Sequence, residues 1–130
     1  MDIGLRQGML TVERDMAAPP ALVWDVLTDL DAWPRWGPTV QRAELAEADQ
    51  LGRGERGKVW TPLGVALPFT ITEYEPGRHW AWQVAGIPAT RHGVEPNGDG
   101  SRAWMGVPWW APAYLAVCAI ALQRIDRMTS

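Results

Sequence analysis

Nine tryptophans in a chain of 130 residues limit what this sequence can fold into more than any other feature. They occur throughout the chain, from a helical segment near the N-terminus to the approach of the last apolar segment: Trp24, Trp33, Trp36, Trp60, Trp80, Trp82, Trp104, Trp109 and Trp110. Large flat side chains that are spread in this way either fill a core or line a hollow one. The chain is therefore either a rigid, filled module or a container for an apolar ligand.

Length and charge predict one domain, residues 1–130, and exclude several classes of partner. A net charge of −3 and a pI of about 5.3 do not indicate the basic surface that nucleic-acid binding needs. The apolar stretch Trp109–Leu122 is shorter than the ~20 residues that a membrane span needs. The N-terminal residues also lack the pattern of a secretory signal. We therefore expect a cytoplasmic protein without integral membrane association.

Hydrophobic periodicity and turn signals predict an α+β order of elements. Alternating residues favour a first strand over Leu10–Asp15, and Pro20 is well placed to begin a helix after it. A second, short helical turn is expected over Ala32–Trp36, and a final helix over Pro112–Met128. Between them, tight turns separate six strand-like runs, which is typical of an antiparallel meander. These runs are Val40–Ala46, Gly57–Thr61, Val65–Tyr74, His79–Ala85, Ala89–Val94 and Arg102–Val107.

Alternation within the strands predicts which side chains point toward the last helix. The mainly apolar face of each strand should point inward, and the helix should add Tyr114, Val117 and Cys118 or their neighbours. The strand residues on this inward face are Phe69, Ile71, Trp80, Trp82, Val84, Thr90, His92, Val94, Ala103, Met105 and Val107. The interior is then mostly apolar, with His92 as its one ionisable strand residue.

Four segments, in order, resemble the START-like, or SRPBCC, superfamily. Val12–Asp29 resembles the opening of that superfamily, and Trp33–Pro38 resembles the tryptophan signature after its short helix pair. Ile71–Arg78 with Trp82 resembles the central hairpin, and His92–Ser101 resembles the next hairpin. The polyketide cyclase/dehydrase-like proteins are the branch that the chain resembles most.

The resemblance implies the helix-grip fold. In that fold a curved, seven-stranded antiparallel sheet wraps around a long C-terminal helix, and two short helices lie between the first and second strands. Members of the superfamily include lipid carriers, hormone receptors and polyketide aromatase/cyclases. The resemblance therefore implies a pocket, while the activity depends on the residues that line it.

Groups that could support catalysis or bind a metal are few in this sequence. His79 and His92 are the only histidines and lack zinc-ligand spacing, and Cys118 is the only cysteine, so we expect no metal and no cofactor. His92 is the best candidate for a mechanistic role. It is either a histidine bonded to a neighbour on a half-buried strand, a polar anchor for a ligand carbonyl or hydroxyl, or a general acid–base.

The leading hypothesis is a protein that binds a small hydrophobic molecule, such as a lipid, for transport or sequestration. The residues expected to contact this ligand are Phe69, Ile71, Trp80, Trp82, Thr90, His92, Met105, Tyr114, Val117 and Cys118. A cofactor-free polyketide aromatase/cyclase or dehydratase is the first alternative, so the sequence does not decide whether the chain is an enzyme. The second is an interaction module with a filled core that acts as a homodimer. Trp109 and Trp110 would form either an apolar lip of the pocket or part of the dimer contact.

Overall fold

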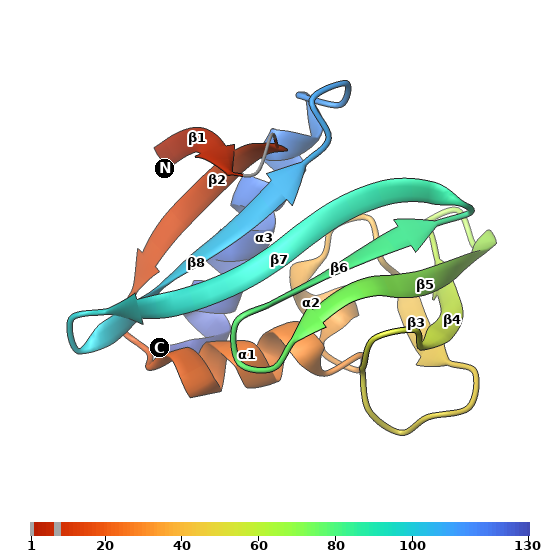
Figure 1. Cartoon of the computed structure of the whole chain (residues 1–130), viewed down its shortest axis with the longest axis horizontal. Helices are drawn as coiled ribbons and strands as arrows, with labels where there is room; N and C mark the ends of the chain where they lie inside the picture. Colours follow the sequence, from red (N-terminus) through yellow and green to blue (C-terminus); the bar gives the residue numbers. More distant parts are fainter. Residues whose placement is uncertain (1, 7–8) are drawn as a thin grey trace.

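One curved antiparallel sheet contains all eight strands of the computed structural model, which describes residues 2–6 and 9–130. The strands lie in the order β1-β2-β8-β7-β6-β5-β4-β3 (Figure 1). The β1–β2 hairpin and the β3–β8 meander meet where β2 pairs with β8. The strands are β1 Asp2–Arg6, β2 Met9–Met16, β3 Arg42–Leu45, β4 Arg56–Trp60, β5 Ala66–Glu75, β6 His79–Val84, β7 Ile87–Asn97 and β8 Gly100–Val107.

Strand β1 corrects the prediction of seven strands. It pairs antiparallel with β2, with Ile3 opposite Val12 and Leu5 opposite Leu10. Without it, β2 would present a row of unpaired N–H and C=O groups at the edge of the sheet. The sequence signal for β1 is only the short alternation of Ile3 and Leu5 with polar or small residues, and it becomes a strand because a partner edge is available.

Two β-bulges bend the centre of the sheet. One interrupts the β5–β6 pairing between Ile71 and Glu73, and the other interrupts the β6–β7 pairing between Ala81 and Gln83. A bulge adds a residue to one strand, which increases the local twist and bends that strand. The bends lie next to Trp82, so they shape the part of the sheet that faces the cavities described below.

Three helices lie between β2 and β3 or after β8: α1 Pro20–Thr28, α2 Trp33–Trp36 and α3 Tyr114–Thr129. Helix α1 begins at a proline, as expected, because the first helical N–H has no intrahelical partner in any case. Helix α3 packs against β2 and β8, and α1 packs against β7 and β8. The predicted helix pair before the β3–β8 meander and the long final helix are therefore confirmed.

Helix α3 begins at Tyr114, two residues later than predicted. Trp109 and Trp110 lie in a turn, and successive turns carry the chain to the helix through hydrogen bonds from Ala111 N to Pro108 O and from Tyr114 N to Ala111 O. Proline at 112 has no N–H to donate. The two tryptophans consequently lie outside the helix and are exposed.

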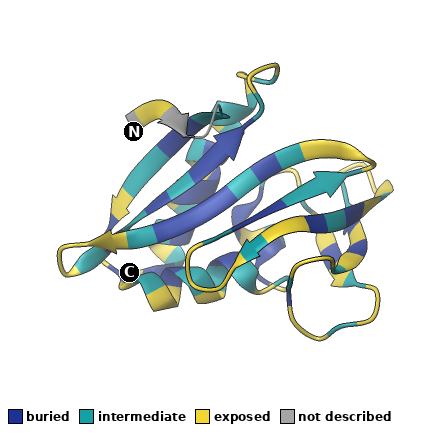
Figure 2. Ribbon diagram, in the orientation of Figure 1, coloured by how far each residue is buried: buried dark blue, intermediate teal, exposed yellow. Residues whose placement is uncertain are grey.

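Side chains from the sheet and from all three helices form one buried cluster. Figure 2 marks along the ribbon which parts of these elements are buried. Strand residues that were predicted to point inward lie in this cluster, among them Phe69, Ile71, Trp80, Ala103 and Met105. No helix in the described part of the chain is long and apolar enough to cross a membrane.

Candidate functional site

The space between the sheet and the N-terminal end of α3 holds an apolar cavity of about 350 Å³, here called the outer cavity. Strands β4 to β8, the segment before β3, the loop before α3 and the first residue of α3 all contribute to its wall. The lining residues are Thr39, Val40, Val59, Thr61, Leu67, Trp82, Val84, Ile87, Pro88, Ala89, Thr90, Val107, Pro108, Trp110, Ala111 and Tyr114. None of these 16 described residues carries a formal charge at neutral pH.

A much smaller void of about 40 Å³, here called the inner void, lies deeper between the sheet and α3. Five residues line both spaces, namely Thr39, Val40, Trp82, Thr90 and Tyr114. These shared residues form a partition between the two. A space of this size accommodates a few waters at most, so the inner end of the space between the sheet and α3 is essentially filled.

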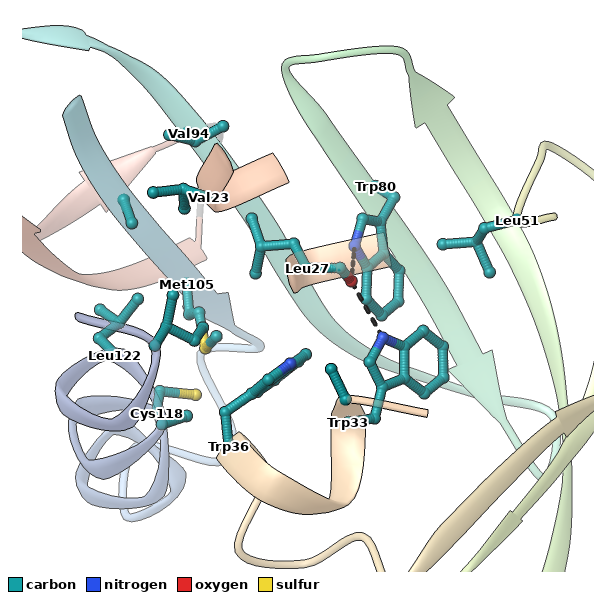
Figure 3. Packing of buried hydrophobic residues seen from close by; sticks show 14 of the residues in the cluster. Val23, Leu27, Trp33, Trp36, Leu51, Trp80, Val94, Met105, Cys118 and Leu122 are labelled. Atoms are coloured by element: carbon teal, nitrogen blue, oxygen red, sulfur yellow. Dashed lines mark hydrogen bonds between the residues drawn. The ribbon is translucent and has the colours of Figure 1, made fainter. Parts of the chain in front are cut away.

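Stacked rings fill the inner end. The Trp80 ring stacks on Trp33 with a centroid distance of 5.0 Å and on His92 with a centroid distance of 3.9 Å. Figure 3 shows Trp33, Trp36 and Trp80 converging on the end of α1, where their indole N–H groups donate to backbone carbonyls. These tryptophans answer the question posed by the sequence in two parts: the interior is filled at its inner end and hollow at its outer end.

A chain of polar side chains connects the two spaces. The Trp82 indole N–H donates to Thr90 Oγ1 at 3.0 Å, and Thr90 Oγ1 lies 2.9 Å from His92 Nε2. An indole can only donate, so the Thr90 hydroxyl accepts from Trp82 and keeps its own proton for another acceptor. Thr90 is thus a polar group on strand β7 that lines both spaces.

His92 is neutral in the folded protein. It is 3% exposed, and burial lowers its pKa to about 3, with the Trp80 backbone acting in the opposite direction. Its Nδ1 atom has no hydrogen-bond partner. His92 borders the inner void and does not line the outer cavity.

An exposed hydrogen bond of 2.6 Å joins Thr39 to the Tyr114 hydroxyl, and both residues belong to the partition. It links the segment before β3 to the start of α3, two parts of the chain that are far apart in sequence. Burial raises the pKa of Tyr114 above its ordinary value of 10.0, so the phenol stays protonated at neutral pH.

The structure divides the predicted ligand-contacting residues into three groups. Trp82, Thr90 and Tyr114 line the outer cavity. Phe69 and Ile71 are buried at 2% and 1% exposure and line neither the outer cavity nor the inner void. The remaining five border the inner void: Trp80, His92, Met105, Val117 and Cys118.

Several lining residues were missed by sequence reasoning. Leu67 extends the same alternation that predicted Phe69, so the signal for it was present, and Val84 was predicted to point inward but was not named as a ligand contact. Thr39 and Val40 lie between α2 and β3, where no periodicity exists to assign a facing. Arg42, at the start of β3, is exposed and lies over the Trp60 ring rather than in either space.

Two larger depressions, of about 870 and 770 Å³, lie elsewhere on the surface. The first is lined by outward residues of β4 and β5, including Arg56 and Lys58, and the second by α1 and the segment after β3, including Asp25 and Asp49. Both contain charged side chains, unlike the outer cavity. Within residues 2–6 and 9–130, no group of three or more His, Cys, Asp or Glu side chains could hold a metal ion.

Comparison with protein families agrees with this geometry. The model of the family described as polyketide cyclase / dehydrase and lipid transport matches residues 7–122. The chain belongs to this family. The prediction of a START-like, helix-grip fold is thereby confirmed, with eight strands in place of seven. Family membership supports hydrophobic ligand binding or cyclase activity as the class of function.

Solved structures from several bacteria share the fold at low sequence identity. A protein from Mesorhizobium loti superposes with a TM-score of 0.73 at 14% identity, covering 92% of this chain and 95% of that one. A protein from Rhodobacter sphaeroides gives 0.68 at 20% identity, covering 98% and 95%. The Aha1 dimer from Colwellia psychrerythraea gives 0.67 at 16% identity, covering 92% and 93%. A comparison with curated proteins found no match.

Proposed function

We propose that this protein binds a small, uncharged hydrophobic molecule in the outer cavity, for transport or sequestration. The observation that carries the proposal is the lining: 16 described residues line a space of about 350 Å³ without one charged side chain. A buried carboxylate or ammonium without a partner is strongly disfavoured. Any charged group of the ligand would therefore have to remain outside the mouth of the cavity.

Thr90 is the proposed anchor for a polar atom of the ligand. Its hydroxyl already accepts from Trp82 and lies beside His92, so a ligand hydroxyl or carbonyl that reaches it joins an existing chain of hydrogen bonds. Trp82 and Tyr114 supply flat apolar surface to the same cavity. The other predicted contact residues border only the inner void, so they would contact the ligand only if the partition opens.

The cavity volume is near the lower end of the ~300–1,000 Å³ range that is typical of small-molecule sites. It therefore suits a compact ligand or one segment of a longer chain. Apolar burial would contribute about 25 cal/mol per Å² of ligand surface before the costs of association.

The cyclase or dehydratase alternative has less support from the geometry. Tyr114 is the one titratable side chain among the described residues of the lining, and burial raises its pKa above 10.0. His92 is neutral and separated from the outer cavity by the partition. A proton transfer at neutral pH would thus lack a well-matched base. A homodimer and a cytoplasmic location remain predictions that accompany the binding proposal.

A matched pair of ligands tests the proposal directly. The neutral dye Nile red would be bound to the protein and displaced at about pH 8 by dodecanol or by dodecanoate, which is ionised there. We expect the alcohol to displace the dye at a concentration at least about tenfold lower, equivalent to about 1.4 kcal/mol. Equal or stronger displacement by the carboxylate, or no binding of the dye, would overturn the proposal.

Variants locate the bound molecule. Thr90→Val keeps the shape of the side chain and removes its hydroxyl, so it should weaken dodecanol and leave dodecane unchanged. Thr72→Val, on an exposed residue of β5, is the matched control. A native mass spectrum of freshly purified protein, followed by extraction, would identify any neutral molecule of a few hundred daltons that the cavity retains from the host.

A further inference from the structure

We propose that the mouth of the outer cavity docks on the surface of a lipid bilayer. Three segments border this mouth, namely residues 61–67 from the end of β4 into β5, 84–90 from the end of β6 into β7, and 107–114 from the end of β8 to the start of α3. They are here called the apolar rim. All three contribute lining residues to the same cavity, for example Leu67, Ile87 and Trp110, so they lie around one opening.

The apolar rim is free of charge over long stretches of sequence. The chain has 12 basic and 15 acidic residues, yet none falls within Thr61–Thr72, Trp80–Thr90 or Ala103–Gln123. Both histidines also lie outside these stretches. Exposed charged side chains lie instead on elements outside these stretches, for example Arg56, Lys58 and Glu73 on β4 and β5.

Large apolar side chains on the rim face solvent. Leu63 is 91% exposed at the tip of the β4–β5 connection, Ile87 is 55% exposed, and Trp109 is 74% exposed. Val65 and Trp110 are exposed beside them. The loop before α3 and the β6–β7 end are largely exposed in Figure 2. Exposed apolar groups gathered around a pocket mark an interaction surface rather than ordinary surface variation.

The chemistry of the rim favours a bilayer over a second copy of the chain. Protein interfaces are commonly surrounded by a polar rim, whereas here the apolar side chains lie at loop tips and the connections that carry them hold no charge. Tryptophan favours the boundary between lipid head groups and acyl chains, where its ring is in an apolar layer and its N–H can be solvated. Two copies joined through this end would also cover both cavities.

The rim lacks basic residues, so docking would depend on apolar insertion. Attraction to anionic head groups needs Lys or Arg near the surface, and the whole chain carries a net charge of −3. Neutral lipid should therefore suffice, and salt should have little effect. This inference goes beyond the proposed ligand binding, and docking would let an apolar molecule enter the cavity without crossing water.

Flotation with phosphatidylcholine vesicles tests the proposal. The wild-type chain should float with neutral vesicles, and replacing part of the lipid by anionic phosphatidylglycerol should not increase the bound fraction. The double variant Leu63→Ser/Trp109→Ser should lower the partition coefficient by about tenfold or more, because both side chains would leave the apolar layer. Absence of flotation by the wild-type chain, or binding that requires anionic lipid, would overturn the proposal.

The variants are chosen so that docking and ligand binding can fail separately. Leu63 and Trp109 do not line the outer cavity, so the double variant should still bind Nile red in solution. Leu22→Ser, at an exposed apolar position on α1, is the matched control and should float like the wild type. Equal loss in this control would contradict the proposal. Light scattering that shows a wild-type dimer and a monomeric double variant would instead assign the rim to self-association.

Discussion

Trp33 and Trp80 share one hydrogen-bond acceptor, the backbone carbonyl of Leu27. The two indole nitrogens lie 3.0 and 3.1 Å from that oxygen, and the rings stack with an interplanar angle of 10° (Figure 3). Leu27 lies in the last turn of α1, where carbonyls have no partner within the helix. The preceding carbonyl, of Val26, accepts from Trp36 at 3.1 Å. Three tryptophans therefore satisfy the buried end of α1.

The shared acceptor predicts that Trp33 and Trp80 are energetically coupled. Trp33→Phe and Trp80→Phe should each destabilise the fold by about 1–3 kcal/mol through lost packing and one lost hydrogen bond. The double variant should cost about 1 kcal/mol more than the sum, because only then does the Leu27 carbonyl lose both side-chain donors. Urea unfolding of the four proteins measures this coupling.

The control for this cycle is Trp60→Phe. Trp60 is half-buried, and its ring lies under the Arg42 guanidinium, away from α1. Its substitution should be additive with either of the others to within about 0.5 kcal/mol, since distant sites rarely interact. Additivity of Trp33→Phe with Trp80→Phe would show that the shared carbonyl is satisfied in some other way.

The order of elements was predictable because it depends on local patterns. Alternation in β5 correctly placed Phe69 and Ile71 on the inward face, and Pro20 marked the start of α1. Strand β1 was not predictable in the same way, since its five residues are too few for a pattern and its formation depends on the free edge of β2. Pairing partners of this kind are a property of the folded chain.

The site was predictable only in part, for a related reason. The inward facing of Trp82 and Thr90 follows from strand alternation, and the structure places both on the outer cavity. Whether the tryptophans fill the interior depends on the bonds of Trp33 and Trp80 to Leu27, which join residues distant in sequence. No periodicity contains that information. Thr39 likewise reaches the partition through its bond to Tyr114, outside any regular element.

Burial of neutral His92 predicts a loss of stability in acid. Its pKa is about 3 in the folded protein, against an ordinary value of 6.5, so the unfolded chain binds an extra proton between these two pH values. Stability should therefore be fully present above about pH 6.5 and fall as the pH decreases toward 3, by up to about 1.4 kcal/mol per pH unit from this group. Urea unfolding at a series of pH values measures the slope.

His92→Gln isolates this effect from the titration of carboxylates. The variant is expected to be less stable near neutral pH, yet its stability should depend less steeply on pH between about 6.5 and 3. His79→Gln, on the outer face beside Trp104, is the control for loss of a histidine elsewhere. Parallel pH curves for the wild type and His92→Gln would contradict the assignment of a buried, neutral imidazole.

A side chain at position 93 would clash with Trp104 on the outer face of the sheet. A Cβ atom at this position would lie 2.3–2.5 Å from three ring atoms of Trp104, closer than atoms in contact can approach. Gly93→Ala should consequently destabilise the fold by about 1–3 kcal/mol as the indole is displaced. In a Trp104→Ala background the same substitution should cost much less, and thermal unfolding of the four combinations tests this. An equal cost in both backgrounds would place the strain in the backbone.

Cys118 should be almost inert toward alkylation in the folded protein. Its side chain is 2% exposed, and burial raises its pKa to about 12 from 9.0. Because the thiolate is the reactive form, its population at about pH 8 falls by about a thousandfold, before any steric protection by α3 and the sheet. Labelling by iodoacetamide should therefore follow global unfolding, with a rate that rises with urea as the unfolding equilibrium does.

The variant Cys118→Ser/Ala116→Cys moves the thiol to an exposed position of α3 and should label rapidly. Rapid labelling of native Cys118 without urea would show that the partition of Thr39 and Tyr114 opens in the folded state, and would contradict a permanently filled inner end.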